Sequence, residues 1–159
     1  MSTHSCSTIV YHCIDFRTIK ETMKFIDEKY GIGNCDIVSV AGSSKGIADD
    51  EGMLAEKNIN EKIIVDDNKN FRCYLLRQLK LSHNLHNSRK VVLINHSDCG
   101  VYNNCYKFSS EAEEKEKQIE DMRKAETIIK KLFPDVSVDK VWAQMLDPHG
   151  KKINFIIVD

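Results

Sequence analysis

No stretch of this sequence approaches the roughly 20 consecutive apolar residues that a membrane-spanning helix requires. Proline and glycine are also scarce, with 2 and 7 residues respectively, which excludes collagen-like and low-complexity classes. Residues 1–13 lack the basic region and the apolar core of a secretory signal peptide. We therefore expect a soluble, cytoplasmic protein that does not associate with a membrane.

An excess of charge of one sign is absent as well. The chain has 23 Lys and Arg residues against 24 Asp and Glu residues, a formal net charge of -1, so no strong field attracts nucleic acid. With 159 residues, 42% of them hydrophobic, it is long enough to bury a sizeable core. We expect one domain that spans residues 1–159. The 6 cysteines are expected to be buried thiols or metal ligands, because disulfides are rare in a reducing compartment.

Runs of β-branched and apolar residues predict short strands, and apolar residues at helical spacing predict longer helices. The strands are expected at residues 8–13, 36–40, 90–95, 138–146 and 153–158, and the helices at 18–31, 68–85 and 110–132. Because strands and helices alternate, we predict an α/β fold with a mainly parallel central sheet of four to five strands flanked by helices. The last strand follows a hairpin turn at residues 147–150 and should be antiparallel. The polar segment 43–67 is compatible with a short helix around residues 49–57 or with a mobile flap.

Several local features refine the helices. Thr18 and Glu21 have the spacing of a capping box, and Ile19, Met23 and Ile26 then share one apolar face. The inward faces of the later helices are expected to include Phe71, Leu75, Leu79, Leu81 and Leu85, and then Ile119, Met122, Ala125, Ile129 and Leu132. The charged run 113–117 is predicted to be a solvated helix face.

Chemically versatile residues directly follow the first and third predicted strands. Cys13 follows the first strand, and His96 and Cys99 follow the third. In parallel sheets, ligands bind beyond the carboxyl ends of the strands, so these side chains should meet there. Two thiolates and one imidazole match a zinc site with three protein ligands and an open fourth position, which is typical of catalytic zinc.

Asp15 and Arg17 lie close to this expected zinc site in the sequence. An arginine can hold a carboxylate bidentately and keep it ionised, free to accept a hydrogen bond from zinc-bound hydroxide. Zinc itself is a Lewis acid that makes hydroxide available near neutral pH. The two residues therefore form a candidate catalytic dyad.

The motif Cys-x-Asp-x-Arg at residues 13–17, followed by His-x-x-Cys-Gly at 96–100, resembles the signature of the β-class carbonic anhydrases. Residues 36–42 also resemble that family's second strand and its Ala-Gly turn, so the resemblance covers most of the chain. It implies a β-carbonic-anhydrase-like fold with Cys13, His96 and Cys99 as zinc ligands. It further implies Asp15 and Arg17 as the dyad, with a substrate pocket near Ala41, Gly42 and Gly100.

The resemblance implies a zinc lyase that interconverts carbon dioxide and bicarbonate, and a homodimer or higher even oligomer whose interface helps form the active site. Two alternatives stay open. One is a related hydrolase that acts on carbonyl sulfide or carbon disulfide, and the other is a zinc-binding homologue without catalytic activity. In some family members the aspartate of the first motif binds the zinc until the arginine reclaims it, and this chain has both residues.

The other candidates favour structural roles. His83 and His86 lie three residues apart on a predicted helix, which fits a surface or helix-end role better than a metal site without a third ligand. His12 should point to the opposite face of its strand from a ligand. Trp142 is expected in the core, and Cys35, Cys73 and Cys105 are expected to be small buried residues.

Overall fold

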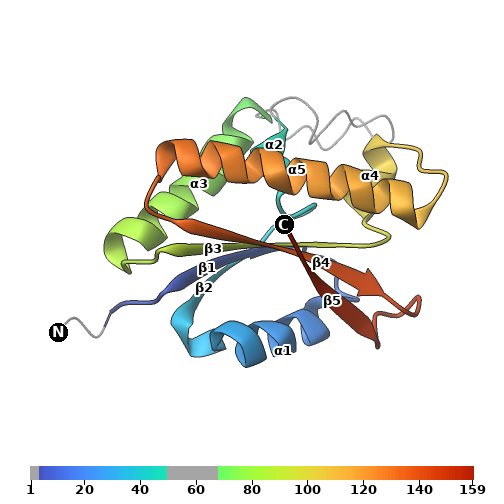
Figure 1. Cartoon of the computed structure of the whole chain (residues 1–159), viewed down its shortest axis with the longest axis horizontal. Helices are drawn as coiled ribbons and strands as arrows, with labels where there is room; N and C mark the ends of the chain where they lie inside the picture. Colours follow the sequence, from blue (N-terminus) through green and yellow to red (C-terminus); the bar gives the residue numbers. More distant parts are fainter. Residues whose placement is uncertain (1–3, 50–67) are drawn as a thin grey trace, which may run out of the picture.

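The computed structural model describes residues 4–49 and 68–159 of the chain. The described elements form one sheet with helices on both faces (Figure 1). The strands are β1 (Thr8–His12), β2 (Cys35–Ser39), β3 (Lys90–His96), β4 (Ser137–Met145) and β5 (Ile153–Val158). The helices are α1 (Ile19–Tyr30), η1 (Ile32–Asn34), α2 (Lys45–Ala48), α3 (Asn68–Leu85), α4 (Gly100–Cys105) and α5 (Glu111–Leu132).

The five strands lie in the order β2-β1-β3-β4-β5, with β3 at the centre. The pairs β1–β2, β1–β3 and β3–β4 are parallel, whereas β4 and β5 are antiparallel. The predicted α/β class, the mainly parallel sheet and the antiparallel last strand are therefore confirmed. β3 has six consecutive buried residues because helices cover both of its faces.

Alternate residues of the central strands belong to two separate apolar cores. Ile9 and Leu93 pack on the α3 and α5 side, together with Leu75, Leu79 and Met122. Val10, Val92 and Ile94 pack instead on the opposite side, against Ile26 of α1. Figure 1 shows α3 and α5 along one face of the sheet and α1 along the other. The two-residue period of a strand thus distributes its apolar side chains between two helical layers.

The capping box predicted at Thr18 and Glu21 is wrong. Thr18 precedes α1, but its side chain makes no capping hydrogen bond, and its hydroxyl donates to the carbonyl oxygen of Asp15. Ile19 is also exposed rather than inward, and the buried face of α1 contains Thr22 and Ile26. The helix does end at Gly31, whose φ of 73° is readily adopted by glycine.

Three leucines assigned to inward helix faces are exposed. Leu81 and Leu85 on α3, and Leu132 at the end of α5, have relative accessibilities of 42%, 63% and 55%. Their spacing fits a helix, but Leu75 and Leu79 already occupy the narrow stripe of α3 that faces the sheet.

The segment after β2 begins with a tight turn, as its small residues predict. Gly42 and Ser43 have φ values of 73° and 50°, and α2 follows at once. Lys45 is fully buried there, and its ammonium group donates to Asp49 and to the hydroxyl of Tyr106. The helix or flap considered around residues 49–57 lies, beyond residue 49, outside the described residues.

In the described ranges, no helix is both long and apolar enough to cross a membrane.

Leu79→Ala should lower the free energy of unfolding by about 2–5 kcal/mol, because Leu79 is fully buried and its truncation leaves a cavity. Leu81→Ala is the matched control on the same helix and should change stability by less than about 0.5 kcal/mol. Urea unfolding of both variants measures the difference. Equal destabilisation by the two substitutions would contradict the assigned inward face of α3.

Candidate metal centre

Cys13, His96 and Cys99 converge at the carboxyl end of the sheet. Cys13 directly follows β1, His96 is the last residue of β3, and Cys99 precedes α4. Their potential ligand atoms all lie within 4.8 Å of one another, and all three residues are buried. The structure thus brings together the three residues that the sequence predicts as ligands.

The imidazole of His96 is oriented for coordination. Its Nδ1 lies 2.8 Å from the carbonyl oxygen of Ser97, a hydrogen bond that places the proton on Nδ1. Its Nε2 is buried and has no hydrogen-bond partner among the described residues. An imidazole whose second nitrogen donates to a carbonyl is the usual arrangement of a metal-bound histidine.

The two cysteine sulfurs also fit a shared cation. Cys13 Sγ and Cys99 Sγ are 4.0 Å apart, close to the about 3.8 Å expected for two sulfurs on one tetrahedral zinc ion. The hydrogen bond between them lowers the pKa of Cys13 and raises that of Cys99. A further hydrogen bond from the Gly42 amide also lowers the pKa of Cys13. The donor set and its burial fit zinc.

Asp15 and Arg17 form the predicted dyad. Arg17 Nε and Nη2 donate to Asp15 Oδ1 and Oδ2 over 3.0 and 2.6 Å. The same guanidinium donates to the carboxylate of Asp98 over 2.6 Å and to its carbonyl oxygen over 2.8 Å. The hydrogen bonds from Arg17 lower the pKa of Asp15, whose Oδ2 lies 4.0 Å from His96 Nε2. Arg17 therefore keeps an ionised carboxylate beside the three ligands, and in this structure Asp15 is engaged by the arginine.

Glu114 contributes a contact that the sequence analysis missed. It lies in the run 113–117, which was predicted to be solvated, but Glu114 is only 5% exposed. Its two carboxylate oxygens accept hydrogen bonds from the backbone amides of Asp98 and Cys99 over 2.9 and 3.0 Å. Gln118, one turn later, donates to Glu114 and to the carbonyl oxygen of His96. One buried face of α5 thus fixes the loop that carries two of the candidate ligands.

The three residues predicted to line the substrate pocket differ in burial and in packing. A Cβ added to Gly42 would lie 3.1 Å from Val101 Cγ1, so glycine permits close packing on α4. Gly100 is exposed and has open space beside its Cα, while Ala41 is partly buried. Their role toward a substrate stays a prediction.

The remaining candidates have structural contacts. His12 is buried between the carbonyl oxygen of Cys13 and the hydroxyl of Ser39, and Trp142 is in the core, as predicted. His83 pairs with Asp135 and is therefore not directed to the same site as His86. Cys73 is exposed, which corrects its predicted burial, and Cys35 and Cys105 are partly buried.

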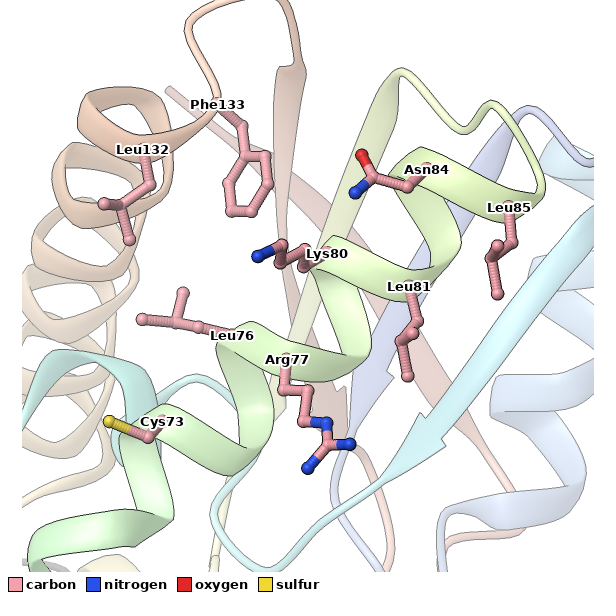
Figure 2. A pocket seen from close by; sticks show the side chains of 9 residues that line it. All are labelled: Cys73, Leu76, Arg77, Lys80, Leu81, Asn84, Leu85, Leu132 and Phe133. Carbon is pink, nitrogen blue, oxygen red and sulfur yellow. The ribbon is translucent and has the colours of Figure 1, made fainter.

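A separate groove of about 730 Å³ lies between α3 and the end of α5. Figure 2 shows Leu132 and Phe133 facing Leu76 of α3 across this groove. It lies toward the amino ends of the parallel strands, at the opposite end of the sheet from His96. The groove is apolar and does not include the metal centre.

A family of proteins described as "Putative carbonic anhydrase" matches residues 52–149, which is more than half of the chain. The chain therefore belongs to the carbonic anhydrase-like family. The matched region contains His96 and Cys99, whereas Cys13, Asp15 and Arg17 precede it.

Two curated relatives are each 27% identical to this chain over 138 residues, which is 85% of its length. They are uncharacterized proteins of Rickettsia bellii and Rickettsia conorii, and the alignment covers 74% and 66% of their lengths. Among solved structures, a carbonic anhydrase from Glaciozyma antarctica has a TM-score of 0.51 and 15% identity, over 90% of this chain and 79% of that one. An apo form of carbon disulfide hydrolase has a TM-score of 0.43 and 17% identity, over 89% and 75%. The first of these likenesses establishes a shared fold.

Glu114→Gln should weaken zinc binding by about 10- to 100-fold, because an amide cannot accept from both backbone N–H groups that position the Cys99 loop. Glu116→Gln, an exposed substitution on the same helix, should leave the affinity unchanged. Competition with a chromogenic chelator measures both affinities. If the two variants bind zinc equally well, Glu114 does not support the metal centre.

Proposed function

We propose that this protein catalyses the reversible hydration of carbon dioxide to bicarbonate, with a zinc ion held by Cys13, His96 and Cys99. The observation that carries the proposal is the buried Nε2 of His96, which lies within 4.8 Å of two thiols and has no hydrogen-bond partner in the described part of the chain. Membership of the carbonic anhydrase-like family supports it.

Zinc in such a site supplies a Lewis acid that makes hydroxide available near neutral pH. The protein supplies the ligands and their orientation. Cys13 and Cys99 contribute two negative charges, and His96 contributes a neutral nitrogen whose direction is set by its hydrogen bond to Ser97. Two thiolates would neutralise the charge of a bound zinc ion, so activation of water would depend on the polar groups around the ligands.

Asp15 is the group that acts on the nucleophile. Ionised and 4.0 Å from His96 Nε2, its Oδ2 is positioned to accept a hydrogen bond from the attacking oxygen and to direct a lone pair toward the carbon of carbon dioxide. Arg17 maintains the charge and the orientation of Asp15, and Asp98 in turn anchors Arg17. Arg17 is thus a positioning residue, whereas Asp15 is the catalytic one.

The surroundings suit a small apolar substrate. Cys13, Cys99 and Tyr102 form a buried cluster, against which Val101, Tyr106 and Phe108 pack. This packing buries Cys13 and Cys99, so that electrostatic interactions at the two sulfurs are only weakly screened by water. Hydration of carbon dioxide there would yield bicarbonate and one proton, which would pass to buffer.

Asp15→Asn should lower carbon dioxide hydration by roughly 100-fold or more while zinc content is retained, because the amide cannot accept the same hydrogen bonds as an ionised carboxylate. Stopped-flow hydration assays on protein of verified zinc content measure the loss. Asp27→Asn, a similar change on α1, is the control and should keep full activity. An unchanged rate in Asp15→Asn would contradict the role of Asp15.

The wild-type protein also separates the alternatives. Hydration that is absent with zinc bound, together with release of hydrogen sulfide from carbonyl sulfide or carbon disulfide, would identify a hydrolase of sulfur analogues. Zinc binding without either activity would identify a non-catalytic zinc-binding domain.

We further propose that the protein forms a homodimer that covers the edge of this centre. Ile14 and Phe16 flank Asp15 and are 55% and 84% exposed. Large apolar side chains exposed beside a functional site favour a protein contact there. A second copy would shield them and reduce access of water to Asp15.

Phe16→Glu should convert the dimer to a monomer, because a carboxylate would be buried without a partner in the interface. Leu132→Glu, a change at an exposed leucine beside the groove of Figure 2, is the control and should leave the dimer intact. Sedimentation velocity distinguishes the two states. A monomeric Leu132→Glu variant together with a dimeric Phe16→Glu variant would place the interface at the groove and contradict the proposal.

A further inference from the structure

A second group of metal-ligating side chains lies at the opposite end of the sheet. Cys6 precedes β1, Asp36 is the second residue of β2, and His86 follows α3. Their potential ligand atoms all lie within 4.8 Å of one another. With Ser5, Gly33, Cys35 and His4, they line a cleft of about 200 Å³. This group, which we call the Cys6 cluster, has no part in the function proposed above.

Two hydrogen-bond donors of the Cys6 cluster point to one oxygen atom. Cys6 Sγ lies 3.3 Å from Asp36 Oδ2, and His86 Nδ1 lies 2.7 Å from the same oxygen. Cys6 Sγ is also 3.5 Å from the carbonyl oxygen of Thr8. A thiol and an imidazole thus converge on one carboxylate oxygen through hydrogen bonds. A metal ion bound by the same three atoms would replace the protons of these hydrogen bonds.

A second histidine, His4, borders the Cys6 cluster. His4 Nε2 lies 2.9 Å from His86 Nε2, and the two rings meet edge to face with their centroids 4.6 Å apart. His4 therefore contacts the ring nitrogen of His86 that faces away from Asp36, and it orients the imidazole of His86 from the segment that precedes β1.

The residue types in the Cys6 cluster favour zinc as the bound metal. Thiolate, imidazole and carboxylate are all common ligands of zinc, and ligands on one tetrahedral zinc ion are about 3.3–3.8 Å apart. The Cys6 sulfur and the Asp36 oxygen are 3.3 Å apart, within that range. His86 Nδ1 and the same oxygen are 2.7 Å apart, so this hydrogen bond must open by about 0.6 Å for both atoms to bind one ion. One thiolate and one carboxylate balance the charge of a divalent cation, and ligand protons are released when the metal binds.

We propose that Cys6, Asp36 and His86 form a second zinc site, which fastens the segment before β1 to the start of β2 and the end of α3. The backbone supports this arrangement, because the amide of Cys6 donates to the carbonyl oxygen of His86 over 2.9 Å. Cys6 and Cys13 are at opposite ends of β1, about 20 Å apart along the strand. The two zinc sites therefore cannot share an ion, and each contributes its own equivalent.

The test is the zinc stoichiometry of the full chain, prepared metal-free and titrated at micromolar concentration with metal analysis after dialysis. The wild type should bind two equivalents, and Cys6→Ser and His86→Gln should each bind one. Two matched controls should retain both equivalents. Cys35→Ser removes a thiol of the same cleft whose sulfur faces the carbonyl oxygen of Gly31. His83→Gln removes the neighbouring histidine of α3 that pairs with Asp135.

Cobalt provides a second readout that does not depend on activity. Co²⁺ in the Cys6 cluster should show a thiolate charge-transfer band that persists in the double variant Cys13→Ser/Cys99→Ser and disappears in the triple variant Cys6→Ser/Cys13→Ser/Cys99→Ser. Zinc should also raise the Tm of Cys99→Ser, because binding to the folded chain stabilises it.

The outcomes separate this proposal from the catalytic one. A wild type that binds a single equivalent, lost in Cys99→Ser and retained in Cys6→Ser, would overturn the second site. A single equivalent lost in Cys6→Ser and retained in Cys99→Ser would support the second site and count against the catalytic centre. Retention of two equivalents by Cys6→Ser and by His86→Gln would also overturn the second site.

Discussion

The parallel pairing of β1 with β3 is the constraint on which the geometry of the candidate metal centre depends. His12 pairs with Ile94 in this register, so that the chain leaves β1 at Cys13 just where β3 ends at His96. A slip of one residue would move one strand by about 3.3 Å. That shift is comparable with the 4.8 Å within which the three ligand atoms lie. The register is secured by the alternation of apolar residues, because a slip would exchange the two cores on either side of the sheet.

Segments distant in the sequence then hold the loops in place. The carboxylate of Glu114 accepts from two backbone amides of the loop after β3, and Arg17 joins that loop to the one after β1 through Asp98. The turn between β4 and β5 adds a steric contact, because Gly150 leaves no room for a Cβ against the carbonyl oxygen of Arg17. The backbone around the dyad is thus fixed from three directions, which preorganises the Asp15 carboxylate.

Much of this arrangement could be predicted from the sequence, for physical reasons that also explain the failures. Cys13, His96 and Cys99 lie at or shortly after the carboxyl ends of β1 and β3, and parallel strands bring those ends to one edge of the sheet. Glu114 could not be found in the same way. Local sequence shows a charged run at helical spacing, whereas the burial of one member depends on which face of α5 meets the loop after β3.

The misassigned leucines have a related cause. Helical spacing identifies residues on a common face, but it does not give the width of the contact. Leu81 lies beside the stripe formed by Leu75 and Leu79 and is exposed because the sheet does not reach it. The Cys6 cluster depends in turn on three segments that only the tertiary structure brings together, so His86 had no visible third ligand in the sequence.

The two groups of candidate ligands differ in burial, and therefore in how strongly metal binding is coupled to folding. Cys13, His96 and Cys99 are at most 5% exposed, and the two sulfurs and the imidazole lie where water cannot stabilise a charge. Such a set requires protons or a cation to offset the cost of burying a thiolate, so metal affinity there is coupled to the stability of the fold. The side chains of Asp36 and His86 are 31% and 28% exposed, and water can stabilise their charges. The fold can therefore form the Cys6 cluster without an ion, and metal binding there adds stability to a sheet edge that hydrogen bonds already hold together.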